Sequence, residues 1–240
     1  TPTATIVWFP PTNTPTPLPR PPAPPTLEPR PGLGDLLLED SFDQPEFWLT
    51  ASTASTAILI ARQRLTLSID GAPPGRLLFS SRSEPLLGDF YAEIDATLSL
   101  CRGRDQYGLL VRLMSYQDYY RFAVNCQGET RLERVQGGAA IPLQNWQPSG
   151  DAPRGAPAQV RLGVWAAGPE LRVFLDDHYQ FTVRDPVFAQ GALGVFILSS
   201  SGSPVTVSFS HLRVYQVTYS PPTPSPTPTS SPTPTRTPTP

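Results

Sequence analysis

Apolar and polar residues alternate with a period of two through most of the central part of the chain. The clearest stretch is 91–100, where the even positions from Ala92 to Leu100 are apolar and the odd positions from Tyr91 to Ser99 are mainly polar. Because side chains of a strand point to opposite faces in turn, this pattern predicts a strand with one buried face and one polar face.

The same periodicity predicts many more strands and almost no helix. Further strands are predicted at 65–69, 78–80, 107–114, 119–126, 130–135, 160–165, 171–175, 179–183, 193–198 and 205–214. Turn residues recur about every 8–12 residues, which favours a sandwich or barrel over α/β units. In the last stretch the apolar positions shift by one near Ser210 and His211, which predicts a β-bulge. We therefore expect an all-β fold, a two-sheet antiparallel β-sandwich.

Both ends of the chain are rich in proline and threonine. Of the 32 prolines, 12 fall in residues 1–32 and 9 fall in residues 221–240. Such segments carry too few apolar side chains to offset the chain entropy of folding. We therefore expect disordered linkers at 1–32 and 219–240 and one sandwich domain at 33–218. Linkers on both sides indicate a modular protein with other domains beyond them, extracytoplasmic and either secreted or anchored at the cell surface.

Charge and composition exclude several classes of function. The net charge of −2 does not provide the basic stripe of a nucleic-acid-binding protein. All 18 basic residues are arginines, which excludes a lysine nucleophile, a Schiff-base lysine and a phosphate-loop lysine. The sequence contains no stretch of about 20 apolar residues, so it shows no candidate transmembrane segment.

The two cysteines, Cys101 and Cys126, each lie at the end of a predicted strand, with about 25 residues between them. The two histidines, His178 and His211, are far from both in sequence, so no metal-site spacing appears. We predict a disulfide that ties adjacent strands. Two buried free thiols are the alternative.

Several stretches together resemble a known superfamily. They are EDSFDQPEFW (39–48), DQYGLLVRLMSYQDYYRFAV (105–124), RLGVWAAGPELRVFLDD (161–177), GALGVFILSSS (191–201) and VSFSHLRVY (207–215). In this order the chain resembles the concanavalin A-like, or laminin G-like, jelly-roll superfamily, especially bacterial domains related to family-16 glycoside hydrolases and keto-disaccharide-hydrolase-like domains. The resemblance implies that 39–48 is the opening strand with its turn and that 105–124 is the central hairpin.

The resemblance also provides a test for catalysis. Retaining glucan hydrolases of this fold carry three acids on one strand face, in the pattern E-x-D-x-E or E-x-D-x-x-E. Glu93 and Asp95 fit the first two positions, but the third is Thr97 or Leu98, and neither can supply a proton. We therefore predict a domain without catalytic residues, in which Glu93 and Asp95 are the candidate pair for the alternative of a glycoside hydrolase.

Three aspartates in turns, Asp40, Asp43 and Asp105, are candidates for a structural calcium site, as in some relatives of this fold. Asx turns explain the same positions equally well. We expect no cofactor, and structural calcium is the alternative.

A sugar-binding site combines aromatic rings, which stack on sugar C–H faces, with polar groups that bind hydroxyls. We expect four arginines, two acids and several aromatic residues to converge on the polar face of one sheet. The predicted ligand-binding residues are Tyr91, Glu93, Asp95, Arg112, Tyr119, Arg121, Trp165 and Arg172. Trp146, in a predicted loop at 142–157, is a separate exposed candidate. A solvated face with arginine–carboxylate pairs is the structural alternative.

The sequence therefore predicts a non-catalytic extracytoplasmic binding module whose partner is a carbohydrate or a cell-surface polymer. A structural or protein-interaction domain of the laminin G-like kind is the main alternative.

Overall fold

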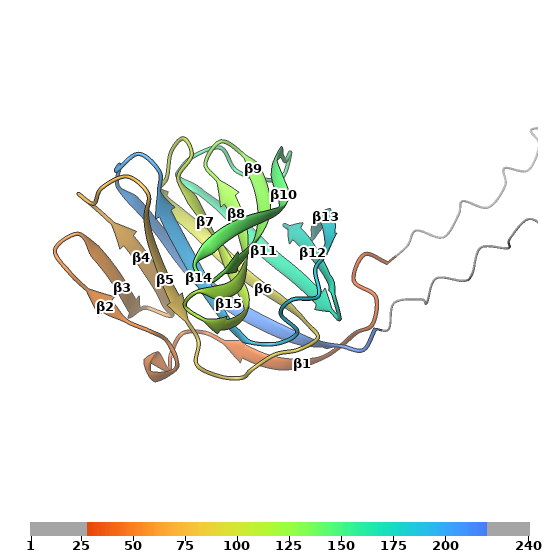
Figure 1. Ribbon diagram of the computed structural model, residues 1–240. Coiled ribbons are helices and arrows are strands. Elements are labelled where there is room, and N and C mark those ends of the chain that lie inside the picture. The colour runs from red at the N-terminus through yellow and green to blue at the C-terminus, as the bar shows by residue number, and fades with distance from the viewer. Residues whose placement is uncertain (1–27, 220–240) are drawn as a thin grey trace, which may run out of the picture.

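The computed structural model describes residues 28–219. Of the linkers predicted at 1–32 and 219–240, residues 1–27 and 220–240 lie outside the described part. The described chain forms two antiparallel sheets and one short 3-10 helix, η1 (Pro45–Phe47) (Figure 1). Within residues 28–219, no helix is long and apolar enough to cross a bilayer. The predicted two-sheet antiparallel β-sandwich is confirmed.

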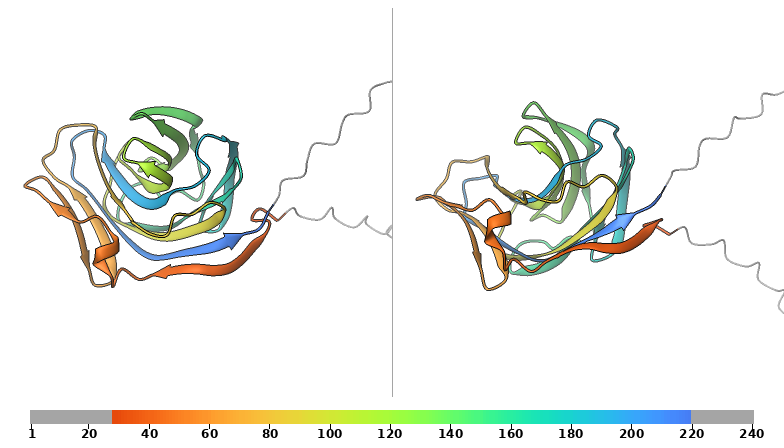
Figure 2. Two further views of the ribbon diagram at one scale, coloured as in Figure 1. Left: turned by 60° about the horizontal axis from the view of Figure 1, so that its bottom comes forward. Right: turned by 90° about the horizontal axis from the view of Figure 1, so that it is seen from below.

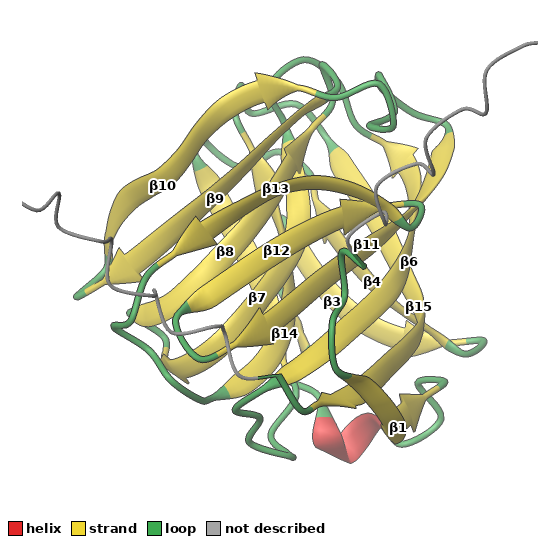
Figure 3. Ribbon diagram, turned by 90° about the vertical axis from the view of Figure 1, so that its right-hand side faces the viewer, coloured by secondary structure: helices red, strands yellow, loops and turns green. Residues whose placement is uncertain are grey.

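The larger sheet has nine strands. Eight of them follow the order β13-β12-β11-β6-β15-β4-β3-β2, and β1 pairs with the second half of β15, on the edge of β15 that faces away from β6. Their bounds are β1 (Leu33–Asp40), β2 (Ala51–Ser52), β3 (Thr56–Ala61), β4 (Arg64–Ile69), β6 (Phe90–Leu100), β11 (Ala158–Ala167), β12 (Glu170–Leu175), β13 (His178–Arg184) and β15 (Val205–Val217). Figure 3 shows the nine-stranded sheet from the side of β13 and β12, with η1 beside β1.

The smaller sheet has six strands in the order β10-β9-β8-β7-β14-β5. Their bounds are β5 (Arg76–Ser81), β7 (Gln106–Ser115), β8 (Asp118–Asn125), β9 (Glu129–Gln136), β10 (Ala139–Pro148) and β14 (Ala192–Ser199). Figure 2 shows that the long strands β1, β15 and β6 curve around the outside of this more tightly curled sheet. The six-stranded sheet therefore has one face toward the core and a concave outer face.

The core lies between the two sheets and is built from the alternation seen in the sequence. Ala92, Ile94 and Ala96 of β6 are fully buried and belong to the same cluster as Leu109 of β7 and Phe122 of β8. Burying a large apolar side chain of this kind contributes about 1.5–3 kcal/mol relative to exposure. The core side of β6 is thus the apolar side that the period of two predicts.

Three expectations about the strands need correction. The opening strand, expected within 39–48 together with its turn, begins earlier, because β1 starts at Leu33 and ends at Asp40, before the turn and η1. The predicted loop at 142–157 begins as strand, since β10 continues to Pro148. Residues 56–61, for which no strand is predicted, form β3, a strand near the edge of the nine-stranded sheet whose exposed Leu59 obscures the alternation.

The predicted β-bulge is present in β15. The pairing of β15 with β6 shifts between Ser210 and Arg213, and His211 has a φ of 52°. The extra residue keeps Phe209 and Leu212 both buried in the core, although they are three positions apart.

The predicted disulfide between Cys101 and Cys126 is present, with 5.9 Å between the Cα atoms. Cys101 follows β6 of the nine-stranded sheet and Cys126 follows β8 of the six-stranded sheet. The expectation that it ties adjacent strands is therefore wrong, because it joins the two sheets at one end of the sandwich.

Candidate functional site

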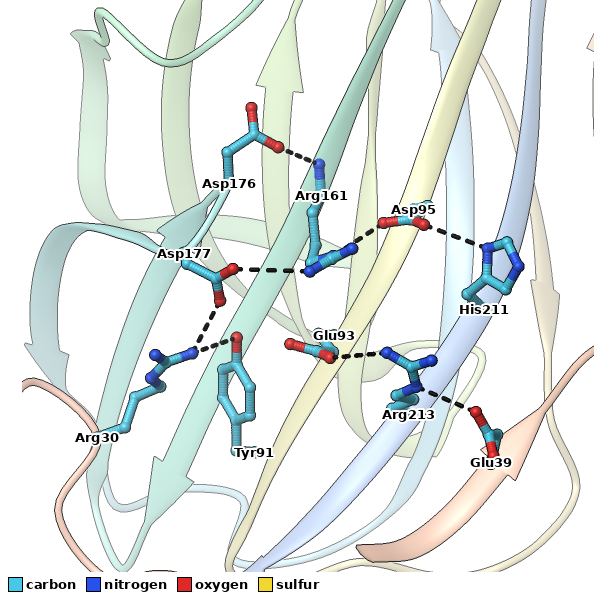
Figure 4. Close-up of polar contacts among 10 residues, drawn as sticks. All are labelled: Arg30, Glu39, Tyr91, Glu93, Asp95, Arg161, Asp176, Asp177, His211 and Arg213. Atoms are coloured by element: carbon cyan, nitrogen blue, oxygen red, sulfur yellow. Dashed lines mark hydrogen bonds and ion pairs between the residues drawn. The ribbon is translucent and has the colours of Figure 1, made fainter.

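The outer face of the nine-stranded sheet carries a row of charged side chains around β6. Alternation directs Glu93 and Asp95 outward, and the register places Arg161 of β11 opposite Asp95 and Arg213 of β15 opposite Glu93. Figure 4 shows these side chains with their neighbours. We call the region formed by Glu93, Asp95, Arg161 and Arg213 the charged face. The predicted residues Glu93 and Asp95 do lie on one sheet face, together with arginines from both flanking strands.

Asp95 is engaged from both sides. Its Oδ1 accepts a hydrogen bond from Nε of Arg161 at 2.9 Å, and its Oδ2 lies 3.2 Å from Nδ1 of His211 (Figure 4). The hydrogen bond to Asp95 raises the pKa of Arg161 above its usual range. The bulge in β15 brings His211 into this position, because the extra residue turns its side chain to the outer face.

Glu93 is slightly more enclosed than Asp95. It is 7% exposed, and its Oε1 lies 3.9 Å from Nη1 of Arg213. Asp177 is linked to Asp95 through Arg161, because Nη1 of Arg161 lies 3.6 Å from Oδ2 of Asp177. Within residues 28–219, no other carboxylate is hydrogen-bonded to Glu93 or Asp95. The charged face is thus a network of ion pairs. The prediction that the domain has no catalytic residues stays untested, as does the alternative of a glycoside hydrolase that uses Glu93 and Asp95.

The aromatic candidates on this sheet, Tyr91 and Trp165, are 1% and 0% exposed. Residues 29–31, which the sequence places in the linker, lie over both rings. Nε1 of Trp165 donates to the carbonyl of Pro31 at 3.1 Å, and Nη1 of Arg172 donates to the carbonyl of Pro29 at 2.9 Å. Three predicted binding residues are therefore already engaged by the chain itself.

Arg112 does not share this face, so the expectation that eight residues converge on one face is wrong. It belongs to β7 of the six-stranded sheet, has a φ of 49° and is fully buried. Its guanidinium donates to the carbonyls of Gly88, Gly168 and Phe188 at 2.7–3.3 Å. Burial lowers the pKa of Arg112 from its ordinary value. The side chain ties three loops to the sheet and has no exposed surface for a ligand.

Tyr119 and Arg121 also lie on the six-stranded sheet, on its concave outer face. Nε of Arg121 donates to Glu133 at 2.7 Å, and its guanidinium lies 5.6 Å from the ring centre of Phe196. Tyr119 is 3% exposed, and burial raises its pKa. The face around them is a packed apolar cluster, formed by Leu110, Leu113, Tyr119, Ala123, Val135, Ala192 and Phe196.

Trp146 lies on strand β10, not in an exposed loop. It is half-buried against this apolar cluster, and the guanidinium of Arg131 is 5.6 Å from its ring centre. The curled edge of the six-stranded sheet therefore covers part of its own concave face.

An open groove of about 630 Å³ lies where this concave face meets η1 and the ends of β5, β7 and β14. Its most exposed apolar side chains are Leu86, Met114 and Tyr116, which are 66%, 59% and 65% exposed. The ring of Tyr116 lies 5.7 Å from that of Phe79 on β5. The groove thus combines an exposed aromatic ring with an apolar floor.

One wall of the groove is fixed by a buried ion pair. Oδ2 of Asp40 accepts hydrogen bonds from Nε of Arg82 at 2.8 Å and from Nε1 of Trp48 at 3.0 Å. Its Oδ1 accepts from the backbone N–H of Phe42 at 2.8 Å. The guanidinium of Arg82 also lies 4.6 Å from the ring centre of Phe47, another groove residue. Asp40 therefore fixes Arg82 and Trp48 directly, and Phe47 through its contact with Arg82.

The calcium candidates have other partners. Asp40 forms the ion pair just described, and Asp105 is fully buried, where its carboxylate accepts from the N–H of Ser200 at 2.9 Å and from the hydroxyl of Ser203 at 3.2 Å. Asp43 is exposed in the turn after β1. In the part of the chain that the structure describes, no cluster of three or more histidine, cysteine, aspartate or glutamate side chains is placed to hold a metal ion.

Sequence reasoning missed the groove because its residues come from separate turns. Tyr116 lies in the predicted turn at 115–118, and an aromatic residue at a hairpin tip has no core to fill, which is a usable signal of a binding role. Arg82 and Phe47 carry no such signal, since only the packing of η1 and the end of β1 against the residues after β5 brings them to the groove.

The fold is similar to several solved structures. Carbohydrate binding module CBM66 from Bacillus subtilis has a TM-score of 0.56 at 20% identity, covering 71% of this chain and 96% of that one. A Bacillus subtilis protein of unknown function with a galectin-like fold has a TM-score of 0.55 at 11% identity, covering 77% and 97%. The catalytic domain of an endo-1,3-beta-glucanase (laminarinase) from Thermotoga petrophila has a TM-score of 0.52 at 10% identity, covering 77% and 98%.

These likenesses identify the fold as a jelly-roll β-sandwich of the concanavalin A-like type, as the resemblance implies. No protein-family model and no curated protein matches the sequence. At identities of 10–20% the likeness establishes the fold, and the ligand has to be argued from the residues of this chain.

Proposed function

We propose that this chain is a carbohydrate-binding module that holds a glycan in the groove beside Tyr116. The observation that carries the proposal is the exposed Tyr116 ring in a groove of about 630 Å³ that is also lined by Arg82, which Asp40 fixes. Ligand sites commonly occupy about 300–1,000 Å³ and combine apolar surface with a few placed polar groups.

The groove has the chemistry that a sugar requires. An exposed aromatic ring provides a flat apolar surface for the C–H face of a pyranose or furanose. Glu46, Arg82 and the hydroxyls of Ser81, Ser83 and Ser115 line the same groove and supply hydrogen-bonding groups for hydroxyls. A neutral polyhydroxylated ligand fits this mixture better than a polyanion, because the groove carries one carboxylate and one guanidinium.

The position of the groove suits a module on a tether. β1 begins beside the end of β15, where Leu33 pairs with Val217, and runs to Asp40 at the groove wall. Figure 1 shows η1 at the far end of β1 from the two ends of the described chain. A strand of eight residues spans about 26 Å, so the two ends of the described chain, at residues 28 and 219, lie away from the groove.

We further propose a non-catalytic role outside the cytoplasm. The carboxylates of Glu93 and Asp95 face arginines and lie on the other sheet from the groove, which supports binding without hydrolysis. A disulfide between the sheets supports an oxidising compartment, because disulfides persist mainly in secreted and cell-surface proteins.

The test is a panel of soluble glycans and insoluble polysaccharides with the wild-type chain and two variants. We expect at least one glycan to bind, with affinity reduced about tenfold or more in Tyr116→Ala, because the loss of a central aromatic contact removes much of the binding energy. Tyr179→Ala is the matched control, since Tyr179 is 48% exposed on β13 of the other sheet.

Equal binding by Tyr116→Ala and the wild type would place the glycan elsewhere and contradict the proposed site. A broad panel without any signal would contradict the carbohydrate-binding function and favour a protein-interaction domain.

A further inference from the structure

The outer face of the nine-stranded sheet holds an arginine in an aromatic cage. The arginine is Arg30, which precedes β1, and we define the arginine cage as Tyr91, Trp165, Arg172, Phe174 and Asp177. The guanidinium of Arg30 lies 5.1 Å from the ring centre of Tyr91 and 5.5 Å from that of Phe174. These distances place the cation over two ring faces, where the ring quadrupole attracts it.

The cation is also bound at its polar edge. Nη1 of Arg30 donates to the hydroxyl of Tyr91 at 3.2 Å and to Oδ1 of Asp177 at 2.9 Å (Figure 4). Burial alone would lower the pKa of Arg30, but the bonds to Tyr91 and Asp177 outweigh it and raise that pKa. The cage therefore recognises both the charge and the planar shape of a guanidinium.

The residues on each side of Arg30 are recognised through their backbone. Arg172 donates to the carbonyl of Pro29 at 2.9 Å, and the indole of Trp165 donates to the carbonyl of Pro31 at 3.1 Å. Proline lacks an N–H, so a proline-flanked segment offers mainly carbonyl acceptors, and the cage presents donors to both. The stiff backbone of such a segment also loses little entropy on binding.

The chain continues from this tripeptide into the sheet through Gly32. Its φ is 72°, and a Cβ there would lie 2.6 Å from the carbonyl oxygen of Thr218 in the segment after β15. Pro29–Pro31 therefore lies at a defined point between the linker and β1.

The same tripeptide occurs a second time in the sequence. Residues 19–21 read Pro-Arg-Pro, as do residues 29–31, ten positions later. The first copy lies outside the described residues. The chain thus contains two segments of identical sequence that are candidates to occupy the arginine cage.

We propose that the arginine cage is a peptide-binding site selective for Pro-Arg-Pro segments of this chain's linker. In the intact chain it holds residues 29–31, and it binds residues 19–21 when residues 29–31 are altered. The inference is independent of the carbohydrate function, since cage and groove lie on different sheets.

The test uses the full chain with Arg20→Ala and Arg30→Ala combined, which removes the arginine from both Pro-Arg-Pro copies. The probe is a peptide with the sequence of residues 17–23, Pro-Leu-Pro-Arg-Pro-Pro-Ala, and the readout is the indole N–H signal of Trp165, assigned with Trp165→Phe. We expect saturable binding and a shift of that signal. Adding Arg172→Ala should weaken binding about tenfold, because a charged hydrogen bond to the peptide is lost.

Two controls complete the design. A peptide with alanine in place of arginine should not shift the signal. The wild-type chain should bind the arginine peptide at least about tenfold more weakly, because its own segment competes at a high effective concentration.

The proposal is overturned if the folded double variant shows no shift at millimolar peptide, if the alanine peptide binds equally well, or if the wild type binds as tightly. Should the double variant lose its folded spectrum, Arg20→Ala with Arg30→Lys replaces it. That chain keeps a cation in the cage, and the arginine peptide must still displace the lysine.

Discussion

At the scale of single residues, a few buried charges hold the loops of this sandwich against its sheets. Arg112 bonds to carbonyls in three loops, Asp105 bonds to the loop after β14, and Asp40 bonds to Arg82 beside the groove. In each case one charged group satisfies several backbone or side-chain partners, and its loss would leave those partners buried and unpaired.

Arg112→Ala is expected to lower the free energy of unfolding by about 3–5 kcal/mol, because it leaves three loop carbonyls without their donor. Arg76→Ala is the matched control, since Arg76 is exposed at the start of β5, and its effect should stay within about 0.5 kcal/mol. Urea unfolding measures both. An equal effect of the two substitutions would show that Arg112 has no structural role.

Glu170 provides a pH-dependent contribution to stability. Burial alone would raise its pKa, but hydrogen bonds from Arg172 at 2.7 Å and Arg184 at 3.0 Å outweigh burial and lower the pKa below 4.5. A carboxyl whose folded pKa is lowered stabilises the fold above its ordinary pKa, and this stability is lost as the pH falls through the folded value.

Glu170→Gln should therefore destabilise the chain by about 1–3 kcal/mol at neutral pH. The difference from the wild type should shrink as the pH falls below 4.5. Urea unfolding at pH values on both sides of this point measures the difference. A difference that stays constant with pH would contradict the assigned role.

At the scale of elements, strand periodicity predicts most of the strands but not the sheet to which each belongs. The alternation of Ala92 to Leu100 identifies both faces of β6, and the shift near His211 identifies the bulge. Nothing in that pattern assigns Tyr119 and Arg121 to the other sheet, because an outward residue looks the same in either one. The disulfide shows the same limit, since its two strands are not neighbours.

The disulfide should contribute about 3.5 kcal/mol to the free energy of unfolding, because it closes a loop with a sequence separation of 25 in the unfolded chain. Chemical unfolding with and without reductant measures this contribution. The double substitution Cys101→Ser and Cys126→Ser should match the reduced wild type. Identical unfolding midpoints for oxidised and reduced chains would show that the bridge between the sheets adds no stability.

At the scale of the whole molecule, the two sheets present different outer faces. The nine-stranded sheet carries the charged face and the arginine cage, and the six-stranded sheet carries an apolar face that opens into the groove. The sequence predicts a binding module, but the groove depends on η1, β5 and the turn at Tyr116 meeting in space. The cage depends equally on the tripeptide at Arg30 reaching β6 and β11, which periodicity does not reveal.

The chain contains a single methionine, Met114, and it lines the groove with 59% of its surface exposed. Labelling its methyl group with carbon-13 therefore gives one NMR signal that reports on the groove alone. Titration with a glycan that binds in the panel should shift this signal saturably, with the affinity measured independently. A signal that stays in place while the glycan binds would contradict the groove as the carbohydrate site.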